Sequence, residues 1–372
     1  MKNFGLLGML LMMTQFAGQA SVVLPVGQWA EPVNKKSLSA DGQVMWYQAS
    51  DIGLEGKGWQ EAGKGTDYGR LPAKAQGTVP DIVWNLGLQC AGLCVRFVTD
   101  SRYLWVHWDL TNSVLDMPHM PSTGVSGIDL YSGDSAGKWT FVANAHPSDV
   151  KSTAKFELSG ANTEYLLYLP LYNGVTQMQI GTTVGAAFSR VRFDPSIKPL
   201  VFYGTSITQG GCASRPGMAT PAIIGRAIDK PIINLGFSGN GRMEPALAQL
   251  VGEIDASVYV VDCLWNMTPS LVHERTIPLV RILRTKRPTT PILLVEDSNY
   301  LDACPTPKGI ILRQEYEALH RAGVANLYFL SAKGMLGTDS EGTVDGCHFT
   351  DLGMMRQAAV FLKALYPLLS TK

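Results

Sequence analysis

The sequence predicts two domains, an all-β sandwich or jelly roll followed by a three-layer α/β domain with a five-stranded parallel sheet. The chain has 372 residues, which is more than one hydrophobic core usually organises. Short β-rich runs separated by turn residues fill residues 22–194, whereas from residue 200 such runs alternate with amphipathic helical segments. Between the two, residues 193–199 contain two prolines and are typical of a linker, so we place the domains at residues 21–195 and 196–372.

The first 20 residues resemble a cleavable secretory signal peptide. Lys2 precedes an apolar segment, residues 4–16, that is too short to cross a bilayer, and small residues up to Ala20 follow it. No later stretch approaches the roughly 20 unbroken apolar residues of a spanning helix. We therefore expect residues 1–20 to be removed and the mature protein to be secreted or periplasmic, without a membrane span.

The charge balance argues against a nucleic-acid partner, and the cysteine spacing argues against a zinc site at Cys90 and Cys94. Lysine plus arginine equals aspartate plus glutamate, at 31 each, and no basic run or basic-aromatic stripe is present, so nucleic acid is not an expected partner. The six cysteines are scattered, and both free buried thiols and disulfides remain open. Cys90 and Cys94 have a C-x-x-x-C spacing but no second ligand pair nearby, so we expect no zinc site there.

The first domain is expected to consist of short strands with little helix. Residues 103–110 illustrate the pattern, because they are rich in β-branched and aromatic side chains. Turn residues separate such runs at short spacing, which favours a sandwich or jelly roll. The expected strands include residues 43–48, 93–99, 103–110, 139–143, 163–169 and 191–193.

One loop of this domain, residues 116–124, is unusual because it contains two prolines and two methionines. Two interpretations remain open. In the first, the loop leans over a neighbouring site, where Met117, His119 and Met120 contact a substrate. In the second, it packs on its own sheet and His119 is a surface or capped histidine.

The second domain is expected to be an open parallel sheet. Its first strand is an apolar run, residues 200–204, that ends at Gly204 and leads directly to Ser206. Right-handed crossovers then place the loops after all the strands on one edge of the sheet. The further strands are expected at residues 231–235, 257–263, 291–295 and 326–330, and the helices at 220–229, 244–251, 269–285, 308–322 and 351–369.

The loops on that edge supply the groups that serine acylation needs, namely a base, a residue that orients the base, and donors for the developing oxyanion. Ser206 follows the first strand. Residues 236–241 follow the second and contain three glycines, which allow a backbone N–H to approach a ligand. Asn266 follows the third strand and offers a neutral amide donor. Asp345 stands three residues before His348, where its carboxylate can orient the imidazole.

These segments resemble the four sequence blocks of the SGNH hydrolases, also called GDSL esterases. The blocks appear in family order as Gly204-Thr-Ser-Ile-Thr208, Asn234-Leu-Gly-Phe-Ser-Gly239, Leu264-Trp-Asn266 and Asp345-Gly-Cys-His348. The resemblance begins near Pro199 and covers the rest of the chain. The first domain, through Gly127-Ile-Asp-Leu-Tyr131 and the Met-Pro-rich loop, looks like the β-sandwich that precedes the catalytic domain in a two-domain branch of the family.

The resemblance implies a flavodoxin-like catalytic domain and a role for each matching residue. Ser206 would be the nucleophile, and His348 would be the base that later protonates the leaving alcohol. Asp345 would orient His348. The oxyanion hole would consist of the backbone N–H groups of Ser206 and Gly239 and the side chain of Asn266.

Two positions depart from the family pattern. Thr205 stands where the family has the aspartate of G-D-S, which leaves the nucleophile intact. Leu264 stands where the family has the glycine of G-x-N, so the third loop is bulkier than usual. Trp265 in that loop joins His119 and Met120 as a candidate substrate contact.

We therefore expect an exported serine esterase that removes short, acetyl-like acyl groups, with carbohydrate as the preferred alcohol partner. The reaction would pass through an acyl-enzyme and would use no metal or cofactor. Two alternatives remain open. One is an acyltransferase that uses the same acyl-enzyme, and the other is a catalytically inactive glycan-binding protein.

Overall fold

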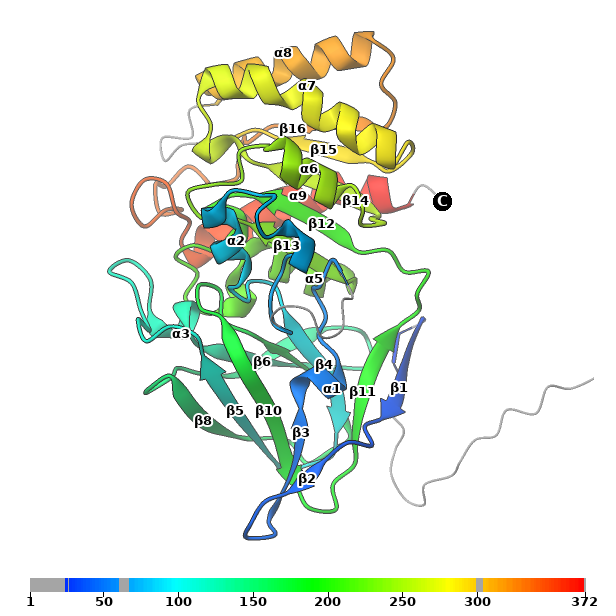
Figure 1. The fold of residues 1–372 in the computed structure, drawn as a ribbon, viewed down its shortest axis with the longest axis vertical. Coiled ribbons are helices and arrows are strands. Elements are labelled where there is room, and N and C mark those ends of the chain that lie inside the picture. The colour runs from blue at the N-terminus through cyan, green and yellow to red at the C-terminus, as the bar shows by residue number, and fades with distance from the viewer. Residues whose placement is uncertain (1–23, 26, 60–66, 299–303, 371–372) are drawn as a thin grey trace, which may run out of the picture.

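The computed structural model describes residues 24–25, 27–59, 67–298 and 304–370. The expected signal peptide, residues 1–20, lies outside this part of the chain. Figure 1 shows a pair of β-sheets at the lower end of the molecule and a helix-covered parallel sheet at the upper end, which confirms the expected fold class. Within the described ranges, no helix has both the length and the apolar character that crossing a membrane requires.

The β region consists of two antiparallel sheets that share one hydrophobic core. Their strand orders are β1-β11-β4-β9-β6-β7 and β2-β3-β10-β5-β8. The strands are β1 (Gln28–Pro32), β2 (Ser37–Leu38), β3 (Val44–Gln48), β4 (Cys94–Thr99), β5 (Tyr103–Leu110), β6 (Ile128–Gly133), β7 (Trp139–Ala145), β8 (Lys151–Glu157), β9 (Thr163–Tyr168), β10 (Val175–Thr183) and β11 (Phe188–Phe193).

Alternation along β5 shows how this core forms. Leu104, Val106 and Trp108 are buried, while the residues between them are partly exposed. In the same core lie Val95 and Phe97 of β4, which belongs to the other sheet. Side chains from the two inner faces therefore pack together, as in a β-sandwich.

Each of the six expected strands overlaps an observed one, and five further strands complete the sheets. The longest of the additional strands is β10, in which Gly181 interrupts a run otherwise rich in valine, isoleucine and threonine. Hydrogen bonding to β3 on one side and to β5 on the other holds it in the centre of its sheet. Pairing with neighbours from distant parts of the chain thus accommodates Gly181 within the strand.

The α/β region is one parallel sheet with strand order β13-β12-β14-β15-β16. Numbered along the chain, this order is 2-1-3-4-5, the flavodoxin-like arrangement. Because every pairing is parallel, all five strands end at the same edge. The strands are β12 (Leu200–Gly204), β13 (Ile232–Gly236), β14 (Val258–Asp262), β15 (Ile292–Val295) and β16 (Leu327–Leu330).

Helices cover both faces of this sheet, which explains why its strands are continuously apolar. Leu200 and Phe202 of β12 pack on one side, and Val201 and Tyr203 pack on the other. The first side is covered by α5 (Thr220–Ile228) and α9 (Asp351–Ser370), and the second by α6 (Pro245–Val251), α7 (Pro269–Lys286) and α8 (Pro307–Arg321).

Local sequence signals decide where α7 and α8 begin. The hydroxyl groups of Thr268 and Thr306 each accept a hydrogen bond from a backbone N–H of the first turn, at 3.3 and 3.0 Å. In both helices a proline follows at the start of the first turn, where its missing N–H costs nothing. Both observed starts lie within one residue of the expected ones.

One segment that precedes the expected domain boundary packs on the α/β region. It comprises a short 3₁₀ turn (Ala73–Ala75) and helix α2 (Asp81–Gly87), which lies beside β13 in Figure 1. Its buried apolar residues share a core with the strands and helices of the second domain, and they are Ala75, Val79 and Val83. The two domains are therefore joined by hydrophobic packing as well as by the linker.

The buried Arg70 adds hydrogen bonds to this junction. Its guanidinium donates to the carbonyl oxygens of Leu86 (2.8 Å) and Gln89 (2.8 Å) in its own region. It also donates to the carbonyl oxygens of Asn234 (3.0 Å) and Gly236 (2.7 Å) at the end of β13. Arg70 thereby fixes the position of β13 against the first domain.

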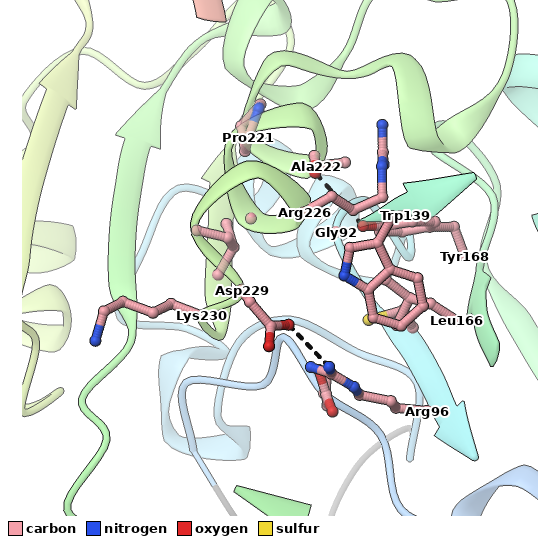
Figure 2. A pocket seen from close by; sticks show the side chains of 14 residues that line it. Gly92, Arg96, Trp139, Leu166, Tyr168, Pro221, Ala222, Arg226, Asp229 and Lys230 are labelled. Carbon is pink, nitrogen blue, oxygen red and sulfur yellow. Dashed lines mark hydrogen bonds and ion pairs between the residues drawn. The ribbon is translucent and has the colours of Figure 1, made fainter. Parts of the chain in front are cut away.

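A second buried arginine, Arg96 of β4, links the domains near α5 (Figure 2). Its guanidinium lies between the rings of Trp139 and Phe193, 4.9 and 4.7 Å from their centroids. It forms ion pairs with Glu164 of β9 and, at 2.8 Å, with Asp229, which directly follows α5. Stacking and charge pairing together offset the cost of burying this cation.

We predict that Arg96→Ala destabilises the protein by about 3–5 kcal/mol, because Glu164 would keep a buried charge without its partner. The measurement is the free energy of unfolding in denaturant, supported by the melting temperature. Arg102→Ala is the matched control, since Arg102 forms an exposed ion pair with Glu157 and its loss should change stability little. Equal effects of the two substitutions would contradict the assigned role of Arg96.

Glu55, in the same buried cluster, should make stability depend on pH. Burial raises the pKa of Glu55 to about 7, above the ordinary value of about 4.3 expected in the unfolded chain. Between these values the folded state binds more protons, so this contribution to stability is lost as the pH rises. The melting temperature of Glu55→Gln relative to wild type should therefore increase from about pH 5 to about pH 8. Glu157→Gln, at an exposed site, should show no such trend, and a flat difference for Glu55→Gln would refute the prediction.

Candidate active site

Ser206 is the first residue of the one-turn helix α4 (Ser206–Gln209), which follows β12 after a tight turn at Thr205. Thr205 caps this helix, and its hydroxyl accepts a hydrogen bond from the Ile207 N–H at 3.3 Å. A side chain at Gly204 has no room, because a Cβ there would lie 2.0 Å from the Thr208 hydroxyl oxygen. The turn thus holds Ser206 at the carboxyl end of β12, where ligands bind in open α/β sheets.

Three side chains from separate parts of the chain form a hydrogen-bonded series. The Ser206 hydroxyl oxygen lies 3.0 Å from Nε2 of His348, and Nδ1 of His348 lies 2.7 Å from Oδ2 of Asp345. An ionised carboxylate only accepts hydrogen bonds, so Nδ1 carries the imidazole hydrogen and the Nε2 lone pair faces the hydroxyl. This arrangement can take a proton from Ser206.

Asp345 is held in place by its own backbone. Its Oδ1 accepts hydrogen bonds from the N–H groups of Cys347 (3.0 Å) and His348 (2.7 Å). Partial burial raises the pKa of Asp345, but these bonds and the bond from the His348 ring outweigh it and bring the pKa to about 2. The carboxylate therefore stays ionised and keeps the imidazole in one orientation.

The loop after β13, residues 237–244, packs directly on the turn that bears Ser206. The Phe237 N–H donates to the Gly204 carbonyl oxygen at 3.0 Å, and a Cβ on Gly241 would lie 1.9 Å from that oxygen. Gly239 and Gly241 have φ angles of 67° and 70°, which side chains disfavour. In the described part of the chain the Gly239 N–H makes no hydrogen bond, so it remains available to a ligand.

Asn266 ends a short 3₁₀ turn, Leu264–Asn266, that follows β14. Its side-chain nitrogen donates to the Asn240 carbonyl oxygen at 2.7 Å, which ties the third loop to the glycine loop. An amide nitrogen carries two hydrogens, so one is left for another acceptor. Lys308 supports the turn from α8, because its ammonium group donates to the Leu264 carbonyl oxygen at 2.8 Å.

Two buried amides that the sequence analysis did not single out, Gln209 and Asn234, connect these loops. The Gln209 amide nitrogen donates to Oε1 of Gln89 (2.6 Å) and to the Leu171 carbonyl oxygen (3.1 Å), and its oxygen accepts the Ser238 N–H (2.9 Å). Asn234 donates to a carbonyl oxygen of the α4 turn at 2.8 Å. Both amides stand in or beside apolar runs of the sequence. This position could have indicated a structural role, since a buried amide has to be hydrogen-bonded.

The Met-Pro-rich loop, residues 116–124, reaches this site. The ring centroid of His119 lies 5.7 Å from that of His348. Two backbone hydrogen bonds between Met117 and Met120, at 2.9 and 3.0 Å, close the loop into a tight hairpin with His119 at its tip. The loop therefore brings His119 beside His348, and contact of its side chains with a substrate stays a prediction.

The candidate substrate contacts fall in different environments. His119 is exposed and lies beside His348, and Trp265 is partly exposed and packs edge-on against Phe349 with a centroid distance of 5.6 Å. Met120 is only 2 % exposed and lies in a hydrophobic cluster, so it supports the loop and offers no surface to a ligand in this structure. The reason is the hairpin, which turns the Met120 side chain inward.

All six cysteines are free thiols, which answers the alternative left open by the sequence. Cys212 and Cys347 lie closest to the site. Burial raises the pKa of Cys212 to about 12, with further contributions from Asp345 and Cys347. At neutral pH Cys212 is therefore a thiol, which is a much weaker nucleophile than a thiolate.

Comparison with known families assigns both halves of the chain. Residues 197–366 match the GDSL-like lipase/acylhydrolase family. Residues 44–188 match the GxDLY family, described as the N-terminus of SGNH-hydrolase-type esterases. Among curated protein sequences, none matches this chain.

Solved structures include similar chains. A protein of Bacteroides ovatus described as a GDSL-like lipase is 33% identical, with 88% of this chain and 99% of that chain covered and a TM-score of 0.81. A salicylyl-acyltransferase from a tetracycline biosynthetic pathway is 16% identical, with coverage of 93% and 96% and a TM-score of 0.66. A family two carbohydrate esterase from Clostridium thermocellum, solved with cellohexaose, is 13% identical, with coverage of 74% and 92% and a TM-score of 0.52. The last two share the fold.

Proposed function

The chain belongs to the GDSL-like lipase/acylhydrolase family, and from this premise we propose that it is an exported serine esterase that removes short acyl groups from carbohydrate. The observation that carries the proposal is the hydrogen-bonded series Ser206, His348, Asp345. A hydroxyl, an imidazole and a carboxylate in this order are what acyl transfer to serine requires. The proposed chemistry uses no metal or cofactor.

In the proposed mechanism His348 moves one proton in each direction. Nε2 accepts the Ser206 proton while Oγ attacks the ester carbonyl carbon, and the imidazolium then donates this proton to the leaving alcohol. The acyl-enzyme is cleaved by water, whose proton passes to Nε2 and then back to Ser206. Asp345 remains ionised throughout and stabilises the imidazolium that forms twice in each cycle.

The oxyanion is assigned to three donors, the N–H groups of Ser206 and Gly239 and the side chain of Asn266. This assignment is supported by the hydrogens of these groups that donate no hydrogen bond within the described structure. The Ser206 N–H is at the first position of α4 and has no intrahelical acceptor, and the Gly239 N–H forms no hydrogen bond in the described structure. Asn266 has one amide hydrogen beyond the one given to Asn240.

A small acyl group is favoured by the crowding around the nucleophile. Ser206 is only 5 % exposed, and Trp265 occupies the third loop, whereas the side chain of Leu264 lies in the hydrophobic core of the α/β region. An acetyl group fits such a site better than a long chain. Carbohydrate as the alcohol partner is supported by the fold shared with a carbohydrate esterase solved with cellohexaose. Export is proposed from the signal-like residues 1–20.

An acyltransferase remains the second candidate, and one observation favours it. His119 belongs to the first domain yet lies beside His348, where it can shield the acyl-enzyme from water or position an acceptor alcohol. Incubation of an activated acetyl ester with excess oligosaccharide separates the candidates. An esterase forms mainly acetate, whereas a transferase forms mainly acetylated oligosaccharide.

Labelling with a fluorophosphonate tests the proposal against the third reading, an inactive glycan-binding protein. An activated serine reacts with this reagent, and mass spectrometry of peptides locates the modified residue. We expect modification of Ser206 in the folded protein and none after denaturation. Failure of the folded protein to react would rule out the esterase.

We predict that Ser206→Ala and His348→Ala each lower kcat for an activated acetyl ester by at least about 10³-fold without changing the melting temperature greatly. The physical reason is that neither the nucleophile nor its base can be replaced by a neighbour. His107→Ala is the matched control and should leave kcat unchanged. His107 lies on the outer face of the first domain, where its ring is hydrogen-bonded to the Thr153 hydroxyl. Near wild-type activity of either active-site variant would overturn the assignment.

We also predict that Asn266→Ala lowers kcat by about 10²–10³-fold with little change in KM, because the lost donor acts on the oxyanion and not on the ground-state ester. Steady-state kinetics with the same acetyl ester measures the effect. Asn326→Ala serves as the control, since Asn326 precedes β16 and bonds the Thr289 carbonyl oxygen at the opposite edge of the sheet. A rise in KM at constant kcat would show that Asn266 binds substrate instead.

A further inference from the structure

Beside the candidate catalytic series, three side chains from separate segments bring metal-ligating atoms together. Each of His119, Cys212 and His348 offers one donor atom, and these atoms all lie within 4.8 Å of one another. Nδ1 of His348 is engaged by Asp345, so its free donor is Nε2, the atom that faces Ser206. His348 is thus common to the candidate catalytic series and to this cluster, and it offers the same atom, Nε2, to both.

The backbone around the cluster is closely packed. Cys212 is buried and has a φ angle of 67°, a conformation that few side-chain-bearing residues adopt. The preceding Gly211 lies against the His348 ring, since a Cβ there would be 3.0 Å from its Cδ2. The loop that bears His119 is fastened to the same segment, because the Thr123 hydroxyl donates to the Ser214 carbonyl oxygen at 2.5 Å.

The donor set suits zinc. Imidazole nitrogen and cysteine sulfur are its preferred ligands, and bonds of about 2.0–2.3 Å in a tetrahedral site place ligand atoms roughly 3.5 Å apart. The observed limit of 4.8 Å therefore requires a closure of about 1 Å. His119 can supply this movement, because its side chain is exposed.

The contact between Asp345 and His348 adds a second feature of zinc sites. Histidine ligands commonly donate their other ring N–H to a carboxylate, which fixes the tautomer and increases the basicity of the coordinating nitrogen. Asp345 accepts from Nδ1 at 2.7 Å and so prepares Nε2 for a metal as well as for a proton. Burial raises the pKa of the Cys212 thiol, but a coordinated divalent cation displaces the thiol proton to solvent.

We propose that His119, Cys212 and His348 bind a Zn²⁺ ion that reversibly inhibits the enzyme. The ion occupies the Nε2 lone pair, so His348 can no longer accept the proton of Ser206. Zinc binding stands on the geometry of the cluster alone, whereas the inhibition rests on the proposed function. The site is thus a zinc-controlled switch on the base, distinct from the metal-free catalytic chemistry.

Binding is tested with Co²⁺ as a spectroscopic probe on the full-length, chelator-treated protein. Wild type should bind one equivalent and show a thiolate-to-cobalt charge-transfer band, which Zn²⁺ abolishes by competition. Cys212→Ser should lose the band, and His119→Ala should weaken binding by at least about tenfold. Cys347→Ser is the matched thiol control and should keep the wild-type spectrum, because Cys347 lies outside the cluster. Absence of the band in wild type, or its persistence in Cys212→Ser, would overturn the proposal.

Inhibition is tested by hydrolysis of an activated acetyl ester at increasing Zn²⁺, with each variant normalised to its own metal-free rate. Wild type should be inhibited and then recover when a chelator is added, whereas Cys212→Ser and His119→Ala should need at least about tenfold more Zn²⁺. Binding without inhibition would overturn the switch but not the site. A metal-free wild type without esterase activity would instead count against the proposed function, and the cobalt spectra would still report on the cluster.

Discussion

The candidate active site depends on a backbone contact that only glycine permits. A Cβ on Gly241 would lie 1.9 Å from the Gly204 carbonyl oxygen, and a Cβ on Gly236 would lie 2.2 Å from the Gln209 nitrogen. With no side chains between them, the turn that bears Ser206 and the loop that bears Gly239 pack backbone to backbone and share a hydrogen bond. Hydrogen bonds connect the loops that bear Asn266 and His348 to these two segments. Asn266 is bound to the glycine loop through Asn240, and His348 is bound to the Ser206 hydroxyl.

The first domain takes part in the construction of the site. Its Gln89 and Leu171 hold Gln209 in α4, and the Tyr172 hydroxyl donates to the Ser206 carbonyl oxygen at 3.4 Å. A loop of the same domain carries His119 to the ring of His348. Arg70 and Arg96 cross the junction with buried hydrogen bonds and ion pairs. A relative movement of the two domains would therefore displace the turn that bears Ser206.

Two kinds of carboxylate serve different purposes in this protein. Glu55 is buried in the domain junction, and burial raises its pKa to about 7, so its charge is easily lost. Asp345 keeps a side-chain exposure of 40%, and hydrogen bonds from His348 and from two backbone N–H groups hold its pKa at about 2. In the proposed mechanism Asp345 stabilises an imidazolium and has to remain ionised, which partial solvation and three donors ensure.

The sequence by itself determined the domain order, the parallel sheet and the identity of Ser206, Asp345 and His348 as candidates. These features follow from local patterns, because a buried strand is apolar along its length and a tight turn needs glycine. Only the tertiary structure decided that β10 forms a central strand, that Gln209 joins three loops and that His119 faces the site while Met120 is buried. It alone brought Cys212 beside His348. Each of these outcomes depends on contacts between segments far apart in the chain, and no local pattern of residues encodes a contact whose partner lies far away in the sequence.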